Sequence, residues 1–175
     1  MIRGRVWKFP NDVNTDYIIP GKYKFKTLDM NELAKHAMEG IDPDFAKKVE
    51  KGDIIVAGKN FGMGSSREQA PLVLKYAGVS LVIAEDFARI FYRNAFNVGL
   101  PVLICRGINE KVDQGDILEV DLRRGKIVNV TKKVEISASP IPDFLLEMVE
   151  VGGLTEYYKK YRKFPWEREN QLKNE

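Results

Sequence analysis

The sequence contains one cysteine, Cys105, and one histidine, His36. A lone cysteine cannot form an intramolecular disulfide, and one cysteine with one histidine excludes the ligand sets of zinc sites and iron–sulfur clusters. If the protein takes part in metal-dependent chemistry, the ligands must therefore come from another chain. We expect His36 to be a surface or hydrogen-bonded helix residue and Cys105 to pack in the core.

Long apolar runs are also absent. None approaches the roughly 20 residues that a membrane helix requires, and the first residues, MIRGRVWKFP, lack the apolar core of a secretory signal. We therefore expect a cytoplasmic protein that does not bind a membrane.

The chain has no large excess of charge of one sign. The net charge is +3, and basic and acidic residues are interleaved, which argues against a nucleic-acid partner. The basic and aromatic segment YYKKYRKFPWEREN near the C-terminus is typical of a solvated helix end or a protein contact. An RNA-binding function is thus the weakest of the alternatives.

The 175 residues, 44% apolar and 30% charged, fit one globular domain. Short apolar or alternating runs predict strands at 2–8, 53–57, 79–85 and 100–105. Helical spacing and end signals predict helices at 30–39, 65–76 and 86–99, the last with Asp86 as its N-cap and Gly99 beyond its end. Strands that alternate with helices predict parallel pairing through right-handed crossovers.

The pattern changes in the last third of the chain. Residues 116–138, DILEVDLRRGKIVNVTKKVEISA, predict β-hairpins with turns near RRGK and TKK. One or two C-terminal helices should follow, because Pro140 and Pro142 suit a helix start. We expect one α/β domain of mixed parallel and antiparallel strands over 1–163, with a C-terminal tail at 164–175.

A glycine-rich segment at 58–71, GKNFGMGSSREQAP, joins a predicted buried strand to a predicted helix. Helix starts bind anions through free N–H groups, and Gly62 and Gly64 would let the backbone approach a ligand closely. Ser65 and Ser66 are each followed three residues later by Glu or Gln, as in a capping box. We therefore expect the helix to begin at Ser65 or Ser66.

The same segment lacks both nucleotide signatures. Arg67 stands where a dinucleotide motif has its third glycine, and no G-K-[ST] triplet is present. Two interpretations remain. Arg67 can bind a carboxylate bidentately, and a serine can transfer a proton if its alkoxide is stabilised; alternatively, the serines only cap a helix and Arg67 lies on the surface.

Three blocks resemble the swivelling domain of aconitases: VNTDYIIPG, GSSREQA and FARIFYRNAFNVGLP. Their order and spacing are similar to the small-subunit family of 3-isopropylmalate dehydratases, especially the short archaeal form shared with homoaconitases. The resemblance covers about residues 2–160. It implies a three-layer β/β/α swivelling domain of the aconitase type, which agrees with the mixed strands and C-terminal helices expected above.

The resemblance also implies a function. The family isomerises 2-isopropylmalate to 3-isopropylmalate by dehydration and rehydration, in leucine biosynthesis. A large subunit holds a 4Fe–4S cluster as Lewis acid, and the small subunit binds no cofactor. By position Ser65 would be the base, Ser66 and Arg67 would bind substrate carboxylates, and Asp16 would orient polar groups, while Thr15 would cap or turn its loop.

Substrate choice depends, by the same resemblance, on the segment GKYKFKTLD at 21–29. Phe25 facing the substrate would suit an isopropyl group, whereas Lys26 would suit an extra carboxylate as a point charge. Neighbouring side chains of an extended loop alternate, so both should not face the site. We favour isopropylmalate and keep homoaconitate, citrate and 2,3-dimethylmalate as alternatives.

Two questions stay open. Arg93 and Asn94, near the end of a predicted helix, are expected to tie that helix to neighbouring loops, with an active-site or subunit contact as the alternative. A non-catalytic anion- or nucleotide-binding module could use the same glycine-rich segment.

Overall fold

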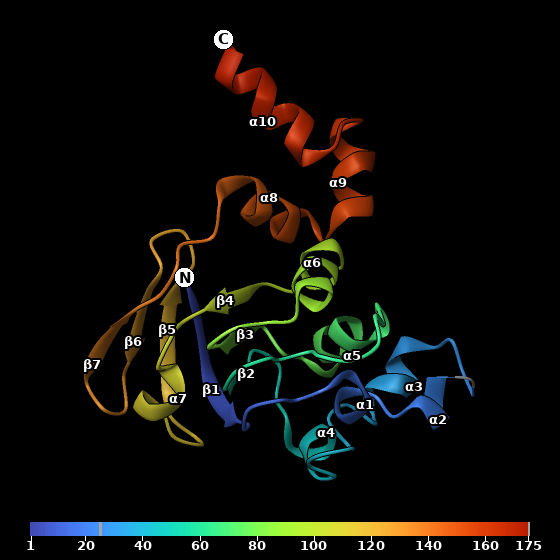
Figure 1. The fold of residues 1–175 in the computed structure, drawn as a ribbon, viewed down its shortest axis with the longest axis vertical. Coiled ribbons are helices and arrows are strands. Elements are labelled where there is room, and N and C mark those ends of the chain that lie inside the picture. The colour runs from blue at the N-terminus through green and yellow to red at the C-terminus, as the bar shows by residue number, and fades with distance from the viewer. Residues whose placement is uncertain (25, 175) are drawn as a thin grey trace.

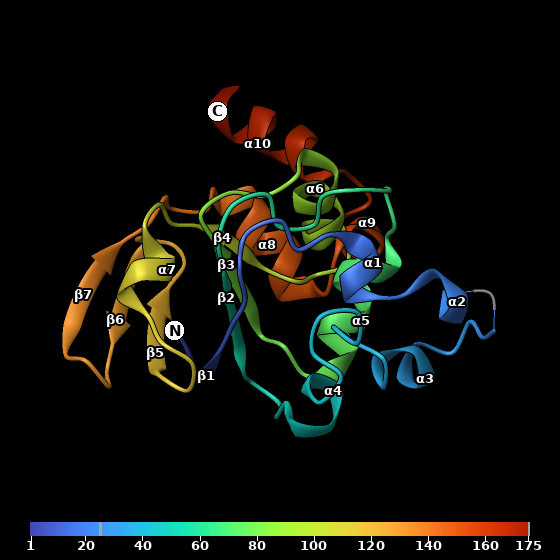
Figure 2. The same ribbon diagram turned by 60° about the horizontal axis from the view of Figure 1, so that its bottom comes forward.

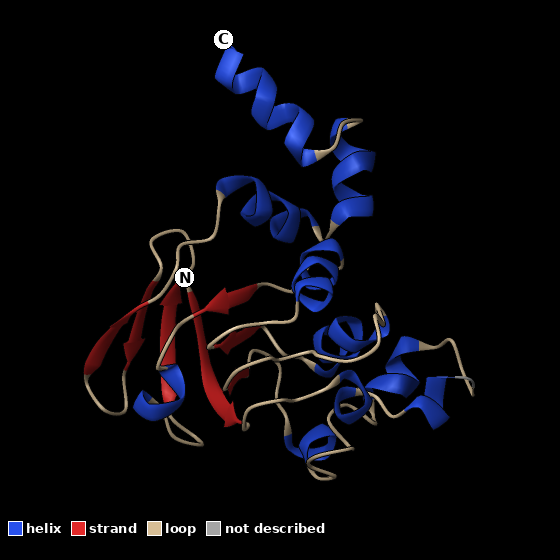
Figure 3. Cartoon of the chain, in the orientation of Figure 1, coloured by secondary structure: helices blue, strands red, loops and turns tan. Residues whose placement is uncertain are grey.

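The computed structural model describes residues 1–24 and 26–174. Seven strands form one sheet in the order β4-β3-β2-β1-β5-β6-β7 (Figures 1 and 3). The strands are β1 Ile2–Lys8, β2 Ile54–Ala57, β3 Leu81–Ala84, β4 Val102–Ile104, β5 Ile117–Asp121, β6 Lys126–Asn129 and β7 Val134–Ser137. Strands β1 to β4 pair in parallel, and β1, β5, β6 and β7 pair antiparallel. The mixed α/β sheet is therefore confirmed.

Ten helices, most of them short, connect or flank the described strands. They are α1 Thr15–Ile18, α2 Gly21–Lys24, α3 Met30–Ala34, α4 Phe45–Lys48, α5 Gln69–Ala77, α6 Arg89–Asn97, α7 Ile108–Lys111, α8 Asp143–Val151, α9 Leu154–Tyr161 and α10 Pro165–Asn174. Within residues 1–24 and 26–174, no helix is long and apolar enough to cross a membrane.

The molecule has three layers. Figure 2 shows β5 to β7 on the left, β2 to β4 in the middle, and α5, α6 and α8 on the right. Every residue of β2 and β3 is buried, as expected for strands covered on both faces. The two sheet edges meet where Ser139 N donates to Ile104 O at 3.1 Å. The sheet thus curls onto itself, and the expected β/β/α arrangement is confirmed.

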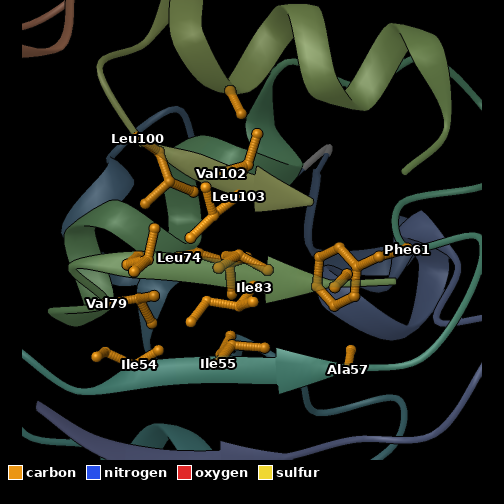
Figure 4. Packing of buried hydrophobic residues seen from close by; sticks show 14 of the residues in the cluster. Ile54, Ile55, Ala57, Phe61, Leu74, Val79, Ile83, Leu100, Val102 and Leu103 are labelled. Atoms are coloured by element: carbon orange, nitrogen blue, oxygen red, sulfur yellow. The ribbon is translucent and has the colours of Figure 1, made fainter. Parts of the chain in front are cut away.

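The middle strands hold the core (Figure 4). Ile55, Ile83 and Leu103 extend from three adjacent strands and lie with Leu74 of α5 in one cluster of buried side chains. Each such aliphatic side chain, fully buried, contributes about 1.5–3 kcal/mol of transfer free energy. This packing fixes the carboxyl ends of β1, β2 and β3, from which the loops described below begin.

Helix α5 begins at Gln69, so the predicted start at Ser65 or Ser66 is wrong. Its N-cap is Glu68, and no side-chain hydrogen bond caps it. The loop before it is held in another conformation, because Thr15 N donates to the Met63 carbonyl at 2.9 Å. The predicted end is confirmed, with Gly78 in the left-handed region at φ +108°.

Two other helix boundaries also differ from expectation. Asp86 does not cap α6, since its carboxylate accepts from Asn60 N, and the N-cap is Ala88. The helix expected at 30–39 ends at Ala34, and turns follow, because Met38 N donates to Ile18 O at 2.8 Å and binds this stretch to α1. Contacts between distant segments override local propensity at both places.

Residues 140–163 form two helices, α8 and α9, which agrees with the one or two that were expected. Pro142 is the N-cap of α8, which confirms the predicted start. The segment 164–175, expected as a tail, includes α10. Arg168 of α10 donates to Tyr157 Oη at 2.8 Å, and its guanidinium lies 3.8 Å from the Tyr161 ring centroid. These contacts attach α10 to α9 (Figure 1).

Candidate active site

A cavity of about 310 Å³ opens where the glycine-rich loop meets α6 and the start of α1. The loops that form it follow β1, β2 and β3, so the cavity lies at the carboxyl ends of parallel strands, where open α/β sheets bind ligands. Its lining residues are Thr15, Gly62, Gly64, Ser65, Ser66, Arg67, Ala88, Arg89, Ile90, Phe91 and Asn94.

Two glycines let the loop follow this path. Gly62 has φ +82°, and a Cβ on it would lie 2.2 Å from Phe91 Cγ. Gly64 has φ +100°, and its Cβ position is 3.4 Å from Thr15 Oγ1. The backbone therefore passes directly against α6 and α1, with no space for a side chain at residue 62.

Ser65 is exposed at the cavity surface, and a buried threonine holds its peptide group. Thr15 Oγ1 donates to Ser65 O at 3.1 Å and lies 3.5 Å from Ser65 Oγ. The cap of α1 is Asn14 rather than Thr15, because Asn14 Oδ1 accepts from Tyr17 N at 2.9 Å. Thr15 thus holds the Ser65 peptide group at the cavity and does not cap α1 as expected.

Arg67 is largely buried, with 18% of its side chain exposed. Its Nη1 lies 2.8 Å from Asp16 Oδ1 and donates to Ile19 O at 3.3 Å. Two acceptors on and just after α1 therefore fix the guanidinium beside the two serines. Asp16 therefore contributes to the site through its ion pair with Arg67.

The comparisons with known proteins agree with this geometry. The family model described as Aconitase C-terminal domain matches residues 16–106. The 3-isopropylmalate dehydratase small subunit 2 of Archaeoglobus fulgidus is 61% identical over 90% of this chain and 94% of its own length. The methanogen homoaconitase small subunit of Methanothermobacter thermautotrophicus is 55% identical over 91% of this chain and 92% of its own.

A solved structure is similar along almost the whole chain. The crystal structure of 3-isopropylmalate dehydratase from Methanocaldococcus jannaschii matches with a TM-score of 0.86 and 48% identity, and covers 99% of both chains. The chain belongs to the aconitase C-terminal domain family, among the 3-isopropylmalate dehydratase small subunits. The fold predicted from the three sequence blocks is therefore confirmed.

Only one of the two residues expected to select the substrate, Lys26, lies in the described part of the chain. Phe25 lies outside the described residues. Lys26 is exposed, does not line the cavity, and has its Nζ 5.7 Å from the Tyr23 ring centroid. The role expected for Phe25 and Lys26 in substrate choice therefore stays a prediction.

The third sequence block divides between two surfaces. Asn94 lines the cavity, as do Arg89 and Ile90, whereas Arg93 lines an apolar pocket between α6 and α8. For Asn94 this position fits the alternative of an active-site contact better than the favoured one, loop packing. Helical spacing was the available signal, because residues 90, 91 and 94 share one face of a helix.

The described residues contain no group of three or more His, Cys, Asp and Glu side chains that could hold a metal ion. Cys105 directly follows β4 and is buried, and this burial raises the pKa of its thiol. His36 contacts Glu39 and Tyr23 rather than the cavity. Cys105 thus packs in the core as predicted, and His36 is hydrogen-bonded as predicted but lies in the turns after α3 rather than in a helix.

Proposed function

We propose that this chain is the small subunit of a cytoplasmic two-subunit hydro-lyase that isomerises 2-isopropylmalate to 3-isopropylmalate in leucine biosynthesis. The observation that supports this most directly is the cavity, which gathers Ser65, Ser66 and Arg67 at the carboxyl ends of the parallel strands. The close relatives named as dehydratase small subunits support the same reaction class.

Ser65 is the proposed base. As an alkoxide it takes the proton from the substrate carbon beside a carboxylate, while the hydroxyl leaves from the neighbouring carbon. Rehydration with the two positions exchanged gives the isomer. Thr15 Oγ1 holds the Ser65 peptide group through the Ser65 carbonyl, and the Arg67 cation, which lines the same cavity, favours the charged form of the serine.

Ser66 and Arg67 are the proposed carboxylate-binding residues. Ser66 is exposed at the cavity, and Arg67 offers a planar, permanently charged donor set. Asp16 is proposed to orient that guanidinium, because it pairs with Nη1 at 2.8 Å and leaves the rest of the fork for substrate. A carboxylate held there places the adjacent C–H bond next to Ser65.

The cluster-bearing partner is part of the proposal. A 4Fe–4S cluster needs three or four thiolates, and this sequence has one cysteine, so its residues do not fit the cluster. We place the cluster in a large subunit, where it would supply a Lewis acid for the leaving hydroxyl. Met63 and Ile90, 40% and 53% exposed beside the cavity, give the partner apolar surface to cover.

The preferred substrate is 2-isopropylmalate, and homoaconitate, citrate and 2,3-dimethylmalate are the alternatives. Lys26 is the residue of the 21–29 segment that we expect to attract a further carboxylate. A substrate panel on the complex decides between them. Turnover of homoaconitate with a lower KM than isopropylmalate would overturn our preference.

The test of the function is anaerobic assembly with a cluster-bearing large subunit. The isolated chain should be inactive, and the complex should form the unsaturated intermediate from 2-isopropylmalate. Calorimetric titration of the isolated chain with ATP and NAD tests the non-catalytic alternative. Tight nucleotide binding together with an inactive complex would contradict the proposal.

A further inference from the structure

A compact polar cluster joins α2 to the turns that follow α3. Tyr23 Oη donates to Glu39 Oε1 at 2.7 Å, and His36 Nδ1 lies 2.5 Å from Glu39 Oε2. The Tyr23 and His36 rings stack with centroids 3.7 Å apart and an interplanar angle of 8°. One carboxylate therefore binds both members of a stacked pair, with Tyr23 from α2 and His36 from the turns after α3.

Charged groups stabilise the cluster of Tyr23, His36 and Glu39. Burial raises the pKa of the Glu39 carboxyl, but the hydrogen bonds from Tyr23 and His36 and the charge of Lys22 outweigh it, so the net shift is downward. Glu39 is thus ionised at neutral pH and is a charge-assisted acceptor. Lys22 Nζ lies 5.0 Å from the Tyr23 ring centroid and adds a cation–π contact.

Helix α2 in turn lies against the guanidinium of the active site. The Cβ position of Gly21 is 3.5 Å from Arg67 Nη2 and 3.6 Å from Nη1. Arg67 also donates to Ile19 O, two residues before α2 begins. The first residue of α2 therefore forms one wall for Arg67, while Tyr23, two residues later, is fixed by Glu39.

The remaining contacts make Glu39 part of a rigid frame. Gly40 N donates to Tyr17 O at 3.1 Å, which ties the residue next to Glu39 to α1. Helix α1 carries Asp16, the ion-pair partner of Arg67. The guanidinium is thus bounded by α1 and α2, and the stretch around Glu39 holds both.

We propose that Glu39 is a positioning residue, which holds α2 against Arg67 through Tyr23 and so sets the affinity of the site for the substrate carboxylate. This inference rests on the proposed function, in which Arg67 binds that carboxylate. Glu39 does not line the cavity, and its effect passes through the placement of α2. The chemistry at Ser65 does not depend on it.

Kinetics of the complex separate this role from a merely structural one. Tyr23→Phe, which keeps the ring and removes the hydroxyl, should raise KM about fivefold and leave kcat within about twofold, as expected for one lost hydrogen bond that acts on binding. Glu39→Ala should act in the same way. The double variant should have a KM no higher than that of the stronger single variant, because both substitutions remove the same Tyr23–Glu39 hydrogen bond.

The matched control is Glu32→Gln on α3. Glu32 forms an exposed ion pair with Lys35 at 2.8 Å, and that pair does not touch α2. Its removal should leave KM unchanged. The conservative Glu39→Gln, which retains an acceptor oxygen for Tyr23, should recover most of the affinity lost in Glu39→Ala. Equal KM values for wild type and Tyr23→Phe in an active complex would overturn the proposal and leave the proposed function intact.

A second measurement needs no activity. Hydrogen–deuterium exchange of the isolated full chain should show faster exchange at 21–24 in Tyr23→Phe, where Tyr23 N donates to Pro20 O at 3.0 Å, and unchanged exchange in β2 and β3. Unchanged exchange at 21–24 would contradict the proposal even if the complex were inactive with every substrate.

Discussion

Among single residues, Gly62 is the most tightly constrained at the site. Its φ is +82°, and an added Cβ would overlap Phe91. We expect Gly62→Ala to lower the free energy of unfolding by about 2–4 kcal/mol, from left-handed strain plus overpacking, as measured by urea denaturation. Gly115→Ala is the control, since Gly115 has φ +86° with no atom within 4 Å and should cost about 1–2 kcal/mol. Equal losses would show that the contact with Phe91 is unimportant.

Arg67 acts through its planar fork. Arg67→Lys keeps the charge but cannot contact Asp16, Ile19 and a carboxylate together, so kcat/KM of the complex should fall about 10- to 100-fold. Arg93→Lys on α6 is the control, because Arg93 lines the other pocket. Steady-state kinetics on both variants test this. A kcat/KM for Arg67→Lys within about twofold of wild type would contradict the carboxylate-binding role.

The sequence could locate some of these residues and not others. Ser65, Ser66 and Arg67 were found because they share one short motif that also lines the cavity. Thr15 was given a local capping role, since its bond to Ser65 spans 50 positions and no local pattern encodes it. The contact exists only because the loops after β1 and β2 lie side by side.

At the scale of elements, the strands were predicted well, but the starts of α5 and α6 were not. The apolar runs at 53–57 and 79–85 are stabilised as strands that are buried on both faces of the sheet. The starts of α5 and α6 depend on hydrogen bonds from other loops, through Thr15 and Asn60. Those hydrogen bonds hold Met63 and Asp86 in loops ahead of the two helices, so the local capping pattern was misleading.

Closure of the sheet gives a prediction for Cys105. Its Sγ lies 3.5 Å from Ser137 O, at the junction of the β4 and β7 edges. Burial raises the thiol pKa, so the folded state favours the neutral form, and stability should fall as the pH rises above the unfolded value of about 8.5. Iodoacetamide at pH 9 should alkylate the folded chain far more slowly than the urea-unfolded chain. Equal rates would mean that the two edges do not close.

At the scale of the whole molecule, the cavity opens on a face of the chain that we propose a partner subunit covers. The cavity opens beside exposed Met63 and Ile90, and under the proposed function this chain would supply a base and a cation, with the cluster ligands left to the partner. The three-layer fold followed from three short blocks in the right order. Helix α10 was not predicted, because it is held by Arg168 contacts with α9 that leave no periodic pattern.

Proton removal by Ser65 is the central step of the proposed function. The assembled complex should exchange the substrate proton beside the carboxylate with solvent deuterium, as followed by NMR. Ser65→Ala should lower that exchange rate about 10²- to 10⁴-fold in a complex that still assembles, whereas Ser66→Ala should mainly raise KM. Exchange at the wild-type rate in Ser65→Ala would show that another group is the base.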